Sequence, residues 1–296
     1  MTSTPEGGSA VPCATPAPPS SLSPSRAADF MQCPLRYRFR VIDKLPEKPS
    51  EAATRGTVVH AVLERLFDAP RAERTAVRAR AMVPVEWERL LAQKPELAEL
   101  FADDEAGPGA ERLARWLESA ERLVDRWFSL EDPTRLEPAE RELYVETALE
   151  SGLVLRGYVD RLDVAPSGDL RVVDYKTGKA PRAEYAADAL FQMKFYALVL
   201  WRLHGVVPRR LQLVYLGSGD VVTCDPTAEE LRGVERKLLA LWEAIQRATE
   251  SGDWRPRPSR LCDWCDHQPV CPAFGGTPPV YPLPTMRRPP GAEERA

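Results

Sequence analysis

The sequence of 296 residues lacks the signals that would place it in a membrane or outside the cell. No apolar run is long enough to cross a bilayer. No basic segment followed by an apolar block opens the chain, so no secretory signal is expected. There is no internal repeat, and the formal net charge of −4 does not favour nonspecific binding to polyanions. We therefore expect a cytoplasmic protein with no membrane partner.

The six cysteines indicate a metal site. Without a secretory signal they point to a reducing compartment, where cysteines hold metal more often than they form disulfides. Three of them form a compact set, Cys262, Cys265 and Cys271. For a fourth ligand, Cys13 falls in a polar lead-in and Cys224 ends a predicted strand, which leaves Cys33 in the first ordered segment. Four thiolates suit either a tetrahedral zinc ion or an iron–sulfur cluster, and their spacing does not separate the two.

Composition divides the chain into an ordered centre and two polar ends. Residues 1–21 are rich in Pro, Ser, Thr and Ala and are expected to be disordered, as is the Pro-rich tail, 277–296. Residues 22–276 form the expected domain, with a helical insertion at about 70–135 and the cysteine cluster region at 252–274.

Periodicity within the ordered centre switches between helix and strand. Helices are expected from Pro24 and over 56–67, 85–130 (broken at 107–109), 183–203 and 227–249, and strands over 141–148, 153–164, 170–175, 211–216 and 221–223. This order predicts an α/β fold, with a mixed central sheet flanked by helices and a helical insertion.

The most informative segment is a pair of predicted strands that carry Asp160 and Asp174. Alternate side chains of a strand share a face, so Asp174 and Lys176 project together while Tyr175 points away. If residues 166–168 close a three-residue loop, strict pairing sets Asp160 opposite Asp174, although a bulge at Gly168 would slip that register by one residue.

Two acids and a lysine at one place suit the hydrolysis of a phosphodiester. The reaction needs a divalent cation to neutralise the phosphate and lower the pKa of water, and Mg²⁺ or Mn²⁺ takes carboxylate ligands. Lys176 would add positive charge beside the reacting oxygens. Gln192 and Tyr196, four residues apart on a predicted helix, face the same way, and His60 offers a ring nitrogen to the metal.

Each of these features also has a purely structural interpretation. An Asp-x-Lys-Thr-Gly segment can simply end a surface strand, and a histidine or tyrosine of this kind is often a packing residue. Asp163 falls on the opposite strand face from Asp160, so we expect it to pair with Arg161 or a loop amide. The combination of features, rather than any one of them, favours a catalytic site.

In combination the motifs resemble the RecB-like branch of the PD-(D/E)xK nuclease superfamily, and in particular its iron–sulfur members, which include AddB-type and CRISPR-adaptation nucleases. The matching segments, in the family's order, are Leu22 to Tyr37 with Cys33, Gly56 to Glu64 with His60, Gly157 to Arg161, Val173 to Gly178, Gln192 to Tyr196, and Cys262, Cys265 and Cys271. The resemblance spans roughly residues 22–274 and is least informative over 70–135.

The resemblance implies a restriction-endonuclease-like core and a Mg²⁺- or Mn²⁺-dependent DNA nuclease. An exonuclease acting on single-stranded DNA or duplex ends is expected. Metal ligands would be His60, Asp160 and Asp174; Lys176 would be catalytic, with Gln192 and Tyr196 in support; and Cys33, Cys262, Cys265 and Cys271 would hold a structural [4Fe-4S] cluster. The sequence contains no P-loop, so any helicase would be a separate partner.

Two alternatives stay open at this point. One is a nuclease-like module that holds DNA or a partner without cutting, and the other is a zinc-stapled protein unrelated to DNA. The sequence leaves recombination repair, CRISPR adaptation and mobile-element defence equally open as pathways.

Overall fold

The computed structural model describes residues 20–103, 108–182 and 186–281, with the side chains of 186–188 left out. The chain divides into two compact units. The larger unit contains residues 21–25 and 48–239, and the smaller unit contains residues 26–47 and the chain from 240 onward. The predicted disordered segment 1–21 lies almost wholly outside the described residues.

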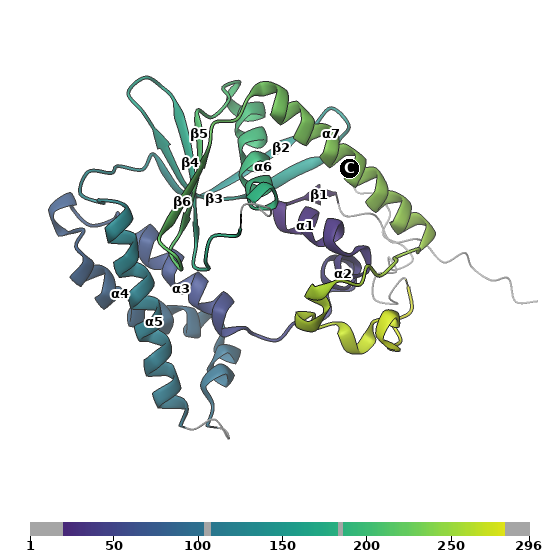
Figure 1. The fold of residues 1–296 in the computed structure, drawn as a ribbon, viewed down its shortest axis with the longest axis horizontal. Coiled ribbons are helices and arrows are strands. Elements are labelled where there is room, and N and C mark those ends of the chain that lie inside the picture. The colour runs from purple at the N-terminus through teal and green to yellow at the C-terminus, as the bar shows by residue number, and fades with distance from the viewer. Residues whose placement is uncertain (1–19, 104–107, 183–185, 282–296) are drawn as a thin grey trace, which may run out of the picture. The chain divides into compact units, whose positions relative to one another are not determined.

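A six-stranded mixed sheet forms the framework of the larger unit (Figure 1). Its strands are β1 (Ser21–Leu22), β2 (Glu140–Ala148), β3 (Val154–Val164), β4 (Leu170–Lys176), β5 (Arg210–Tyr215) and β6 (Asp220–Cys224). The order is β1-β3-β4-β5-β6, and β2 pairs with β3 off this path. The β1–β3 and β4–β5 pairs are parallel and the others are antiparallel, which confirms the expected mixed sheet.

Among the described residues, four long helices lie wholly within the larger unit. They are α3 (Glu51–Leu66), α4 (Ala76–Gln93), α5 (Gly109–Leu130) and α6 (Ala186–His204), with short 3-10 turns at Arg71–Glu73 and Pro95–Phe101. Helices α3, α4 and α5 gather together (Figure 1) and share one core with Val173 and Tyr175 of β4. Helix α6 contacts β2, β3, β4 and β5. The aromatic stripe of α5, with Trp116 and Trp127 buried, is a packing face.

Strands β2 to β6 lie where the sequence predicts them. The helix expected over 85–130 is instead two helices, since α4 ends at Gln93, a 3-10 turn follows at Pro95–Phe101 and α5 begins at Gly109. Helix α3 begins at Glu51 rather than Gly56, because the Ser50 hydroxyl caps it by accepting a hydrogen bond from the Ala53 N–H. Helix α4 begins at Ala76 rather than 85 and contains Pro84 inside it. Strand β1 is too short to give a periodic signal and was not predicted.

The β3–β4 hairpin has the strict register, without the one-residue slip. Pairing of Arg161 with Val173 and of Val164 with Leu170 leaves 166–168 as a three-residue loop, closed by hydrogen bonds between Ala165 and both Gly168 and Asp169. Gly168 has a φ of 86°, a left-handed conformation that glycine adopts without steric cost. The same register, extended past Arg161, faces Asp160 toward Asp174.

A buried arginine holds the core side of this hairpin. Arg161 is 1% exposed, and its guanidinium donates to both Glu131 oxygens at 2.7 and 2.8 Å, to the Tyr175 hydroxyl, and lies 3.1 Å from Asp163. The expected pairing of Asp163 with Arg161 is confirmed. Burial opposes the charged guanidinium, but its anionic neighbours outweigh this and raise the pKa of Arg161. The cation therefore stays charged and ties two strands to the end of α5.

The smaller unit joins two segments that are far apart in the sequence. It contains most of α1 (Pro24–Gln32), all of α2 (Pro34–Tyr37) with a π-helical turn at Arg38–Ile42, the last part of α7 (Ala228–Ser251), and 3-10 turns at Arg260–Trp264, Gln268–Val270 and Pro272–Phe274. Phe30, Tyr37 and Trp254 pack ring against ring at centroid distances of 5.5 to 6.3 Å. Aromatic packing thus joins the two segments.

The predicted tail begins at residue 277, and residues 277–281 are described. The Pro279 carbonyl accepts a hydrogen bond from Arg38, and the Tyr281 hydroxyl donates to the Thr249 carbonyl at 2.9 Å. Residues 282–296 lie outside the described part of the chain. Within the described part, no helix combines the length and apolarity that a membrane crossing requires.

Replacing Arg161 by Met should destabilise the larger unit by about 3–5 kcal/mol, because Glu131 would lose its cation inside the core. Urea unfolding followed by circular dichroism measures the change. Arg115→Met is the control, since Arg115 pairs with Glu111 at the surface, where an ion pair contributes about 0–1 kcal/mol. Equal effects of the two substitutions would contradict the role given to Arg161.

Candidate active site

Four of the predicted residues form one connected polar group between β4 and α6. Lys176 Nζ lies 2.6 Å from Asp174 Oδ2 and donates to Gln192 Oε1 at 2.9 Å. Gln192 Nε2 in turn donates to Asp174 Oδ1 at 3.0 Å and to the Tyr196 hydroxyl at 3.3 Å. Asp174 and Lys176 therefore project to one side of β4, as the strand alternation predicts, and the amide of Gln192 bridges them.

Tyr175, between these two residues, uses its backbone to orient two more. Its N–H donates to Asp160 Oδ2 at 2.7 Å, and its carbonyl lies 2.9 Å from His60 Nε2. A carbonyl only accepts, so His60 Nε2 carries the proton and Nδ1 holds a lone pair in the neutral ring. Nδ1 faces Asp160 Oδ2 at 3.4 Å. This is how a metal-binding histidine is usually oriented, with its other nitrogen held by a backbone carbonyl.

His60, Glu142 and Asp160 form a group with the geometry of a cation site. One ligand atom from each lies within 4.8 Å of the others, and His60 Nδ1 is 3.9 Å from Glu142 Oε1. Pairing of Arg141 with Arg161 and of Leu143 with Val159 places Glu142 opposite Asp160. Glu142 has a φ of 46°, which is sparsely populated for a residue with a side chain and is found most often at functional sites.

The electrostatics also favour a bound cation. Burial, and then the neighbouring Asp160, raise the pKa of Glu142 to about 7. The same two causes, in the same order, raise the pKa of Asp174. Carboxylates that are desolvated beside one another ionise reluctantly, and a divalent ion would relieve both effects.

The predicted ligand set and the observed group differ at one position. His60 and Asp160 lie together as expected, but Asp174 bonds to Lys176 and Gln192, and the third member of the compact group is Glu142. The sequence analysis missed Glu142. The signal that could have found it is an acidic residue in a strand that pairs with the one bearing Asp160, but only the register identifies which acid.

Gly157 explains how Tyr196 reaches this site. A Cβ atom at residue 157 would lie 2.7 Å from a ring carbon of Tyr196, closer than real contacts allow. The missing side chain lets the Tyr196 ring lie against β3 while its hydroxyl accepts from Gln192. Burial raises the pKa of Tyr196 to about 12, so the hydroxyl keeps its proton at neutral pH.

An open cleft of about 410 Å³ adjoins the group. It is lined by Gly56, Thr57, His60, Ala61, Glu64 and Glu142, all from α3 and β2. The side chain of His60 is 27% exposed and that of Glu142 is 35% exposed. A substrate can therefore approach the group from this side.

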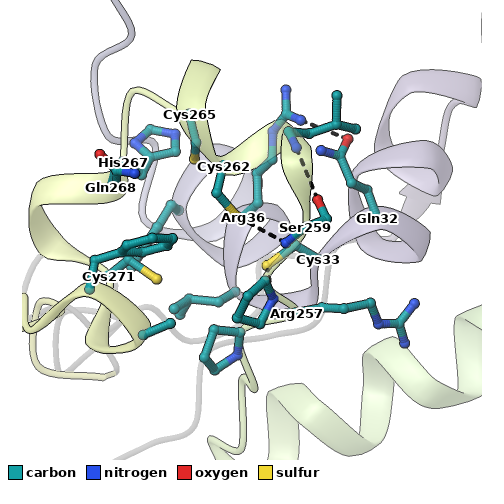
Figure 2. A pocket seen from close by; sticks show the side chains of 17 residues that line it. Gln32, Cys33, Arg36, Arg257, Ser259, Cys262, Cys265, His267, Gln268 and Cys271 are labelled. Atoms are coloured by element: carbon teal, nitrogen blue, oxygen red, sulfur yellow. Dashed lines mark hydrogen bonds between the residues drawn. The ribbon is translucent and has the colours of Figure 1, made fainter.

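Four cysteines lie around one pocket of the smaller unit (Figure 2). They are Cys33, Cys262, Cys265 and Cys271, the four predicted from the sequence, and apolar groups such as Leu35 and Phe39 share the lining. The Arg257 N–H lies 3.4 Å from Cys33 Sγ and the Ser259 N–H lies 3.3 Å from Cys262 Sγ. Backbone donors aimed at sulfur stabilise thiolates, as at metal and cluster sites.

The sulfur atoms are spread more widely than a single zinc ion requires. Among the described residues, no three cysteine sulfurs lie within 4.8 Å of one another. Tetrahedral Zn–S bonds of about 2.3 Å would bring the sulfurs to roughly 3.8 Å.

The affinity of the His60–Glu142–Asp160 group for Mn²⁺ should rise with pH. The pKa of Glu142 is raised to about 7, so below pH 7 a proton competes with the metal, and above pH 7 the carboxylate is free. Isothermal titration at pH 6 and pH 8 should show at least several-fold tighter binding at the higher pH. In Glu142→Gln, which cannot titrate, binding should weaken at pH 8 and the pH ratio should shrink. Glu140→Gln on the same strand is the control, and an unchanged ratio in Glu142→Gln would refute the assignment.

Comparisons with known proteins identify the family and support the fold. Gene 69 protein of Mycobacterium phage D29 is 27% identical over 271 residues, 85% of this chain and 96% of that protein. Gene 69 protein of Mycobacterium phage L5 is 27% identical over 126 residues, 42% of this chain and 41% of that protein. The crystal structure of a "Putative exonuclease" from Eubacterium rectale has a TM-score of 0.51 and 14% identity, covering 84% of this chain and 88% of that chain, which supports the predicted restriction-endonuclease-like fold. A family model for the PD-(D/E)XK nuclease superfamily matches residues 21–272, and the chain belongs to that superfamily.

Proposed function

We propose that the protein is a Mg²⁺- or Mn²⁺-dependent deoxyribonuclease of the RecB-like branch, acting as an exonuclease on single-stranded DNA or duplex ends. One observation carries the proposal: the ligand atoms of His60, Glu142 and Asp160 converge within 4.8 Å, beside the Asp174–Lys176–Gln192 group. Membership of a nuclease superfamily supports phosphodiester hydrolysis as the reaction.

The residues present fit a hard divalent cation. They offer carboxylate oxygens and an imidazole nitrogen already oriented by the Tyr175 carbonyl, with His60, Glu142 and Asp160 as the ligands and Asp174 next to them. A bound cation would supply charge neutralisation of the phosphodiester and a lowered pKa of water. Glu142 and Asp160 also explain why the group needs a cation, since two carboxylates face each other there.

Lys176 supplies the second positive charge. Its ammonium has three donors, of which one goes to Gln192 Oε1 and one faces Asp174 Oδ2. The third has no acceptor among the described residues and is available to a phosphate oxygen. Because Gln192 and Asp174 hold the amine in place, it costs little reorganisation to stabilise charge that develops in the transition state.

The substrate assignment rests on the open cleft and on the resemblance. The structure titled "Putative exonuclease" from Eubacterium rectale has a similar fold, which is consistent with an exonuclease. A cleft of about 410 Å³ beside the carboxylates admits a strand end. A separate helicase would supply unwound strands in that case, since the sequence has no P-loop.

The four-cysteine pocket is proposed to hold a [4Fe-4S] cluster with a structural role. The donor set of Cys33, Cys262, Cys265 and Cys271, their backbone N–H contacts and the wide sulfur spacing favour a cluster over zinc. Such a group would cross-link the segments 26–47 and 240–281 of the smaller unit.

A second function, DNA or partner binding without cleavage, is favoured by one observation only. Trp264, a residue of the smaller unit that is 77% exposed, offers a large aromatic side chain to a binding partner. All residue types needed for hydrolysis are nevertheless present. Binding of DNA with no cleavage under any divalent metal would favour this alternative.

Cleavage of labelled single-stranded DNA should depend on the Asp174–Lys176 pair. We expect Asp174→Asn and Lys176→Ala each to lower the rate by about 10²–10⁴-fold, because a positioned charge or ligand is lost at the reacting phosphate. Lys194→Ala is the matched control, since this lysine of α6 pairs with Glu230 at the surface. Digestion of 5′- and 3′-blocked oligonucleotides by purified protein in Mg²⁺ measures the rates and the polarity. Full activity in both purified site variants would eliminate the proposal.

Anaerobic purification should yield brown protein with about four irons per chain and broad absorption in the visible range. The substitution Cys262→Ala should lose the iron and lower the thermal unfolding midpoint. The control is Cys224→Ala, which lies outside the pocket and should keep the colour. Colourless wild-type protein with one zinc per chain would contradict the cluster assignment without affecting the nuclease proposal.

A further inference from the structure

Two exposed tyrosines stand next to the candidate active site without a role in the fold's core. Tyr144 of β2 and Tyr158 of β3 are direct partners in the strand register. Their ring centroids are 5.2 Å apart with the planes tilted by 55°. Tyr158 is 57% exposed and Tyr144 is 46% exposed, although large aromatic rings in this unit are otherwise mainly buried among the described residues. Both rings are thus accessible to solvent.

The position of the pair relates it to the carboxylates. Tyr158 lies two residues before Asp160 on β3, and Tyr144 lies two residues after Glu142 on β2. Two residues of strand advance by about 6.6 Å and return the side chain to the same face of the strand. Tyr144 and Tyr158 are therefore the next side chains on the same strand faces as Glu142 and Asp160, two of the proposed metal ligands.

The surrounding charges suit a nucleic-acid strand rather than an apolar partner. Arg156 lies two residues before Tyr158 on β3 and close to the Tyr144 hydroxyl, which donates a hydrogen bond to Glu146. The guanidinium offers a cation to a phosphate, while the hydroxyl contacts keep the Tyr144 ring in place. A small aromatic surface with a cation at its edge is typical of sites where unpaired bases stack.

We propose that Tyr144 and Tyr158 form a stacking platform for an unpaired base next to the phosphate to be cut, so that the substrate class is single-stranded DNA or a frayed end. This rests on the proposed function, since it assumes that the carboxylates hold the scissile phosphate. Bases inside a duplex stack on one another and cannot offer a face to the tyrosines. The platform therefore selects strands whose bases are free.

Cross-strand aromatic pairs also stabilise a hairpin, by about 0.2–1 kcal/mol, so the test has to separate stability from binding. Leucine keeps apolar bulk without an aromatic face, and phenylalanine keeps the face without the hydroxyl. The four variants are Tyr144→Leu, Tyr158→Leu, Tyr144→Phe and Tyr158→Phe. Val164→Ala, an exposed apolar residue at the end of β3, is the matched control.

Binding is measured by fluorescence anisotropy in Ca²⁺, with a labelled oligo-dT strand and a labelled blunt hairpin duplex as probes. We expect each leucine variant to bind oligo-dT about 5- to 150-fold more weakly, the loss of one stacked base. The phenylalanine variants, the valine control and duplex binding should change less than about threefold. Equal losses on the strand and the duplex, or no loss in either leucine variant, would overturn the proposal.

Photocrosslinking gives a readout that does not depend on affinity. Oligo-dT with a single 5-iododeoxyuridine should crosslink to the peptide of Tyr144 or Tyr158, identified by mass spectrometry, and the crosslink should vanish in the leucine variant of that tyrosine. A crosslink only at residues outside this pair would count against the platform. Wild-type cleavage in Mg²⁺ reports separately on the nuclease proposal, so failure of one is distinguishable from failure of the other.

Discussion

The candidate site depends on the peptide groups of Tyr175. The Tyr175 N–H donates to Asp160, and the Tyr175 carbonyl accepts from His60. The residues on either side of Tyr175 are Asp174 and Lys176. Side chains alone would not hold four groups from three elements in one geometry, since each has rotamer freedom. A strand backbone is far stiffer, and here it fixes the orientation of a carboxylate and the tautomer of an imidazole together.

The side chain of Tyr175 holds this backbone in place from the core side of the sheet. Its ring is buried against Trp127, and its hydroxyl accepts from Arg161, which in turn is held by Glu131. Burial raises the pKa of the Tyr175 hydroxyl well above its usual range, so the hydroxyl stays protonated beside the cation. The core face of β3 and β4 thus carries a hydrogen-bonded network of a neutral hydroxyl and an ion pair. The opposite face carries the candidate catalytic residues.

Repulsion between like charges destabilises the candidate site when no cation is bound. Glu142 and Asp160 stand opposite each other across paired strands, and Glu142 adopts a left-handed backbone conformation to do so. Close carboxylates and a strained residue persist only where surrounding structure over-determines them, which is common at functional sites. The Tyr144–Tyr158 platform lies on the same two strands, so strand pairing positions both the groups that would hold the phosphate and the surface that would hold a base.

Local sequence determined the hairpin and most of its chemistry. Period-2 alternation put Asp174 and Lys176 together, Gly168 allowed the tight loop, and loop length fixed the register that turns Asp160 toward Asp174. These features depend on neighbours within about a dozen residues, so a single strand pair suffices to predict them. Three of the four cysteines were also found by their spacing, and Cys33 was found by setting aside Cys13 and Cys224.

Tertiary structure alone decided the remaining members. Glu142 belongs to the group because β2 pairs with β3 in a register that sets it opposite Asp160, and local periodicity does not specify that register. The backbone role of Tyr175 is invisible in a sequence, since every residue has the same peptide group. The replacement of Asp174 by Glu142 in the compact group, and the use of Gly157 to admit Tyr196, follow from distances between elements that are far apart along the chain. These distances depend on how separate segments of the chain pack together, which the local sequence does not specify.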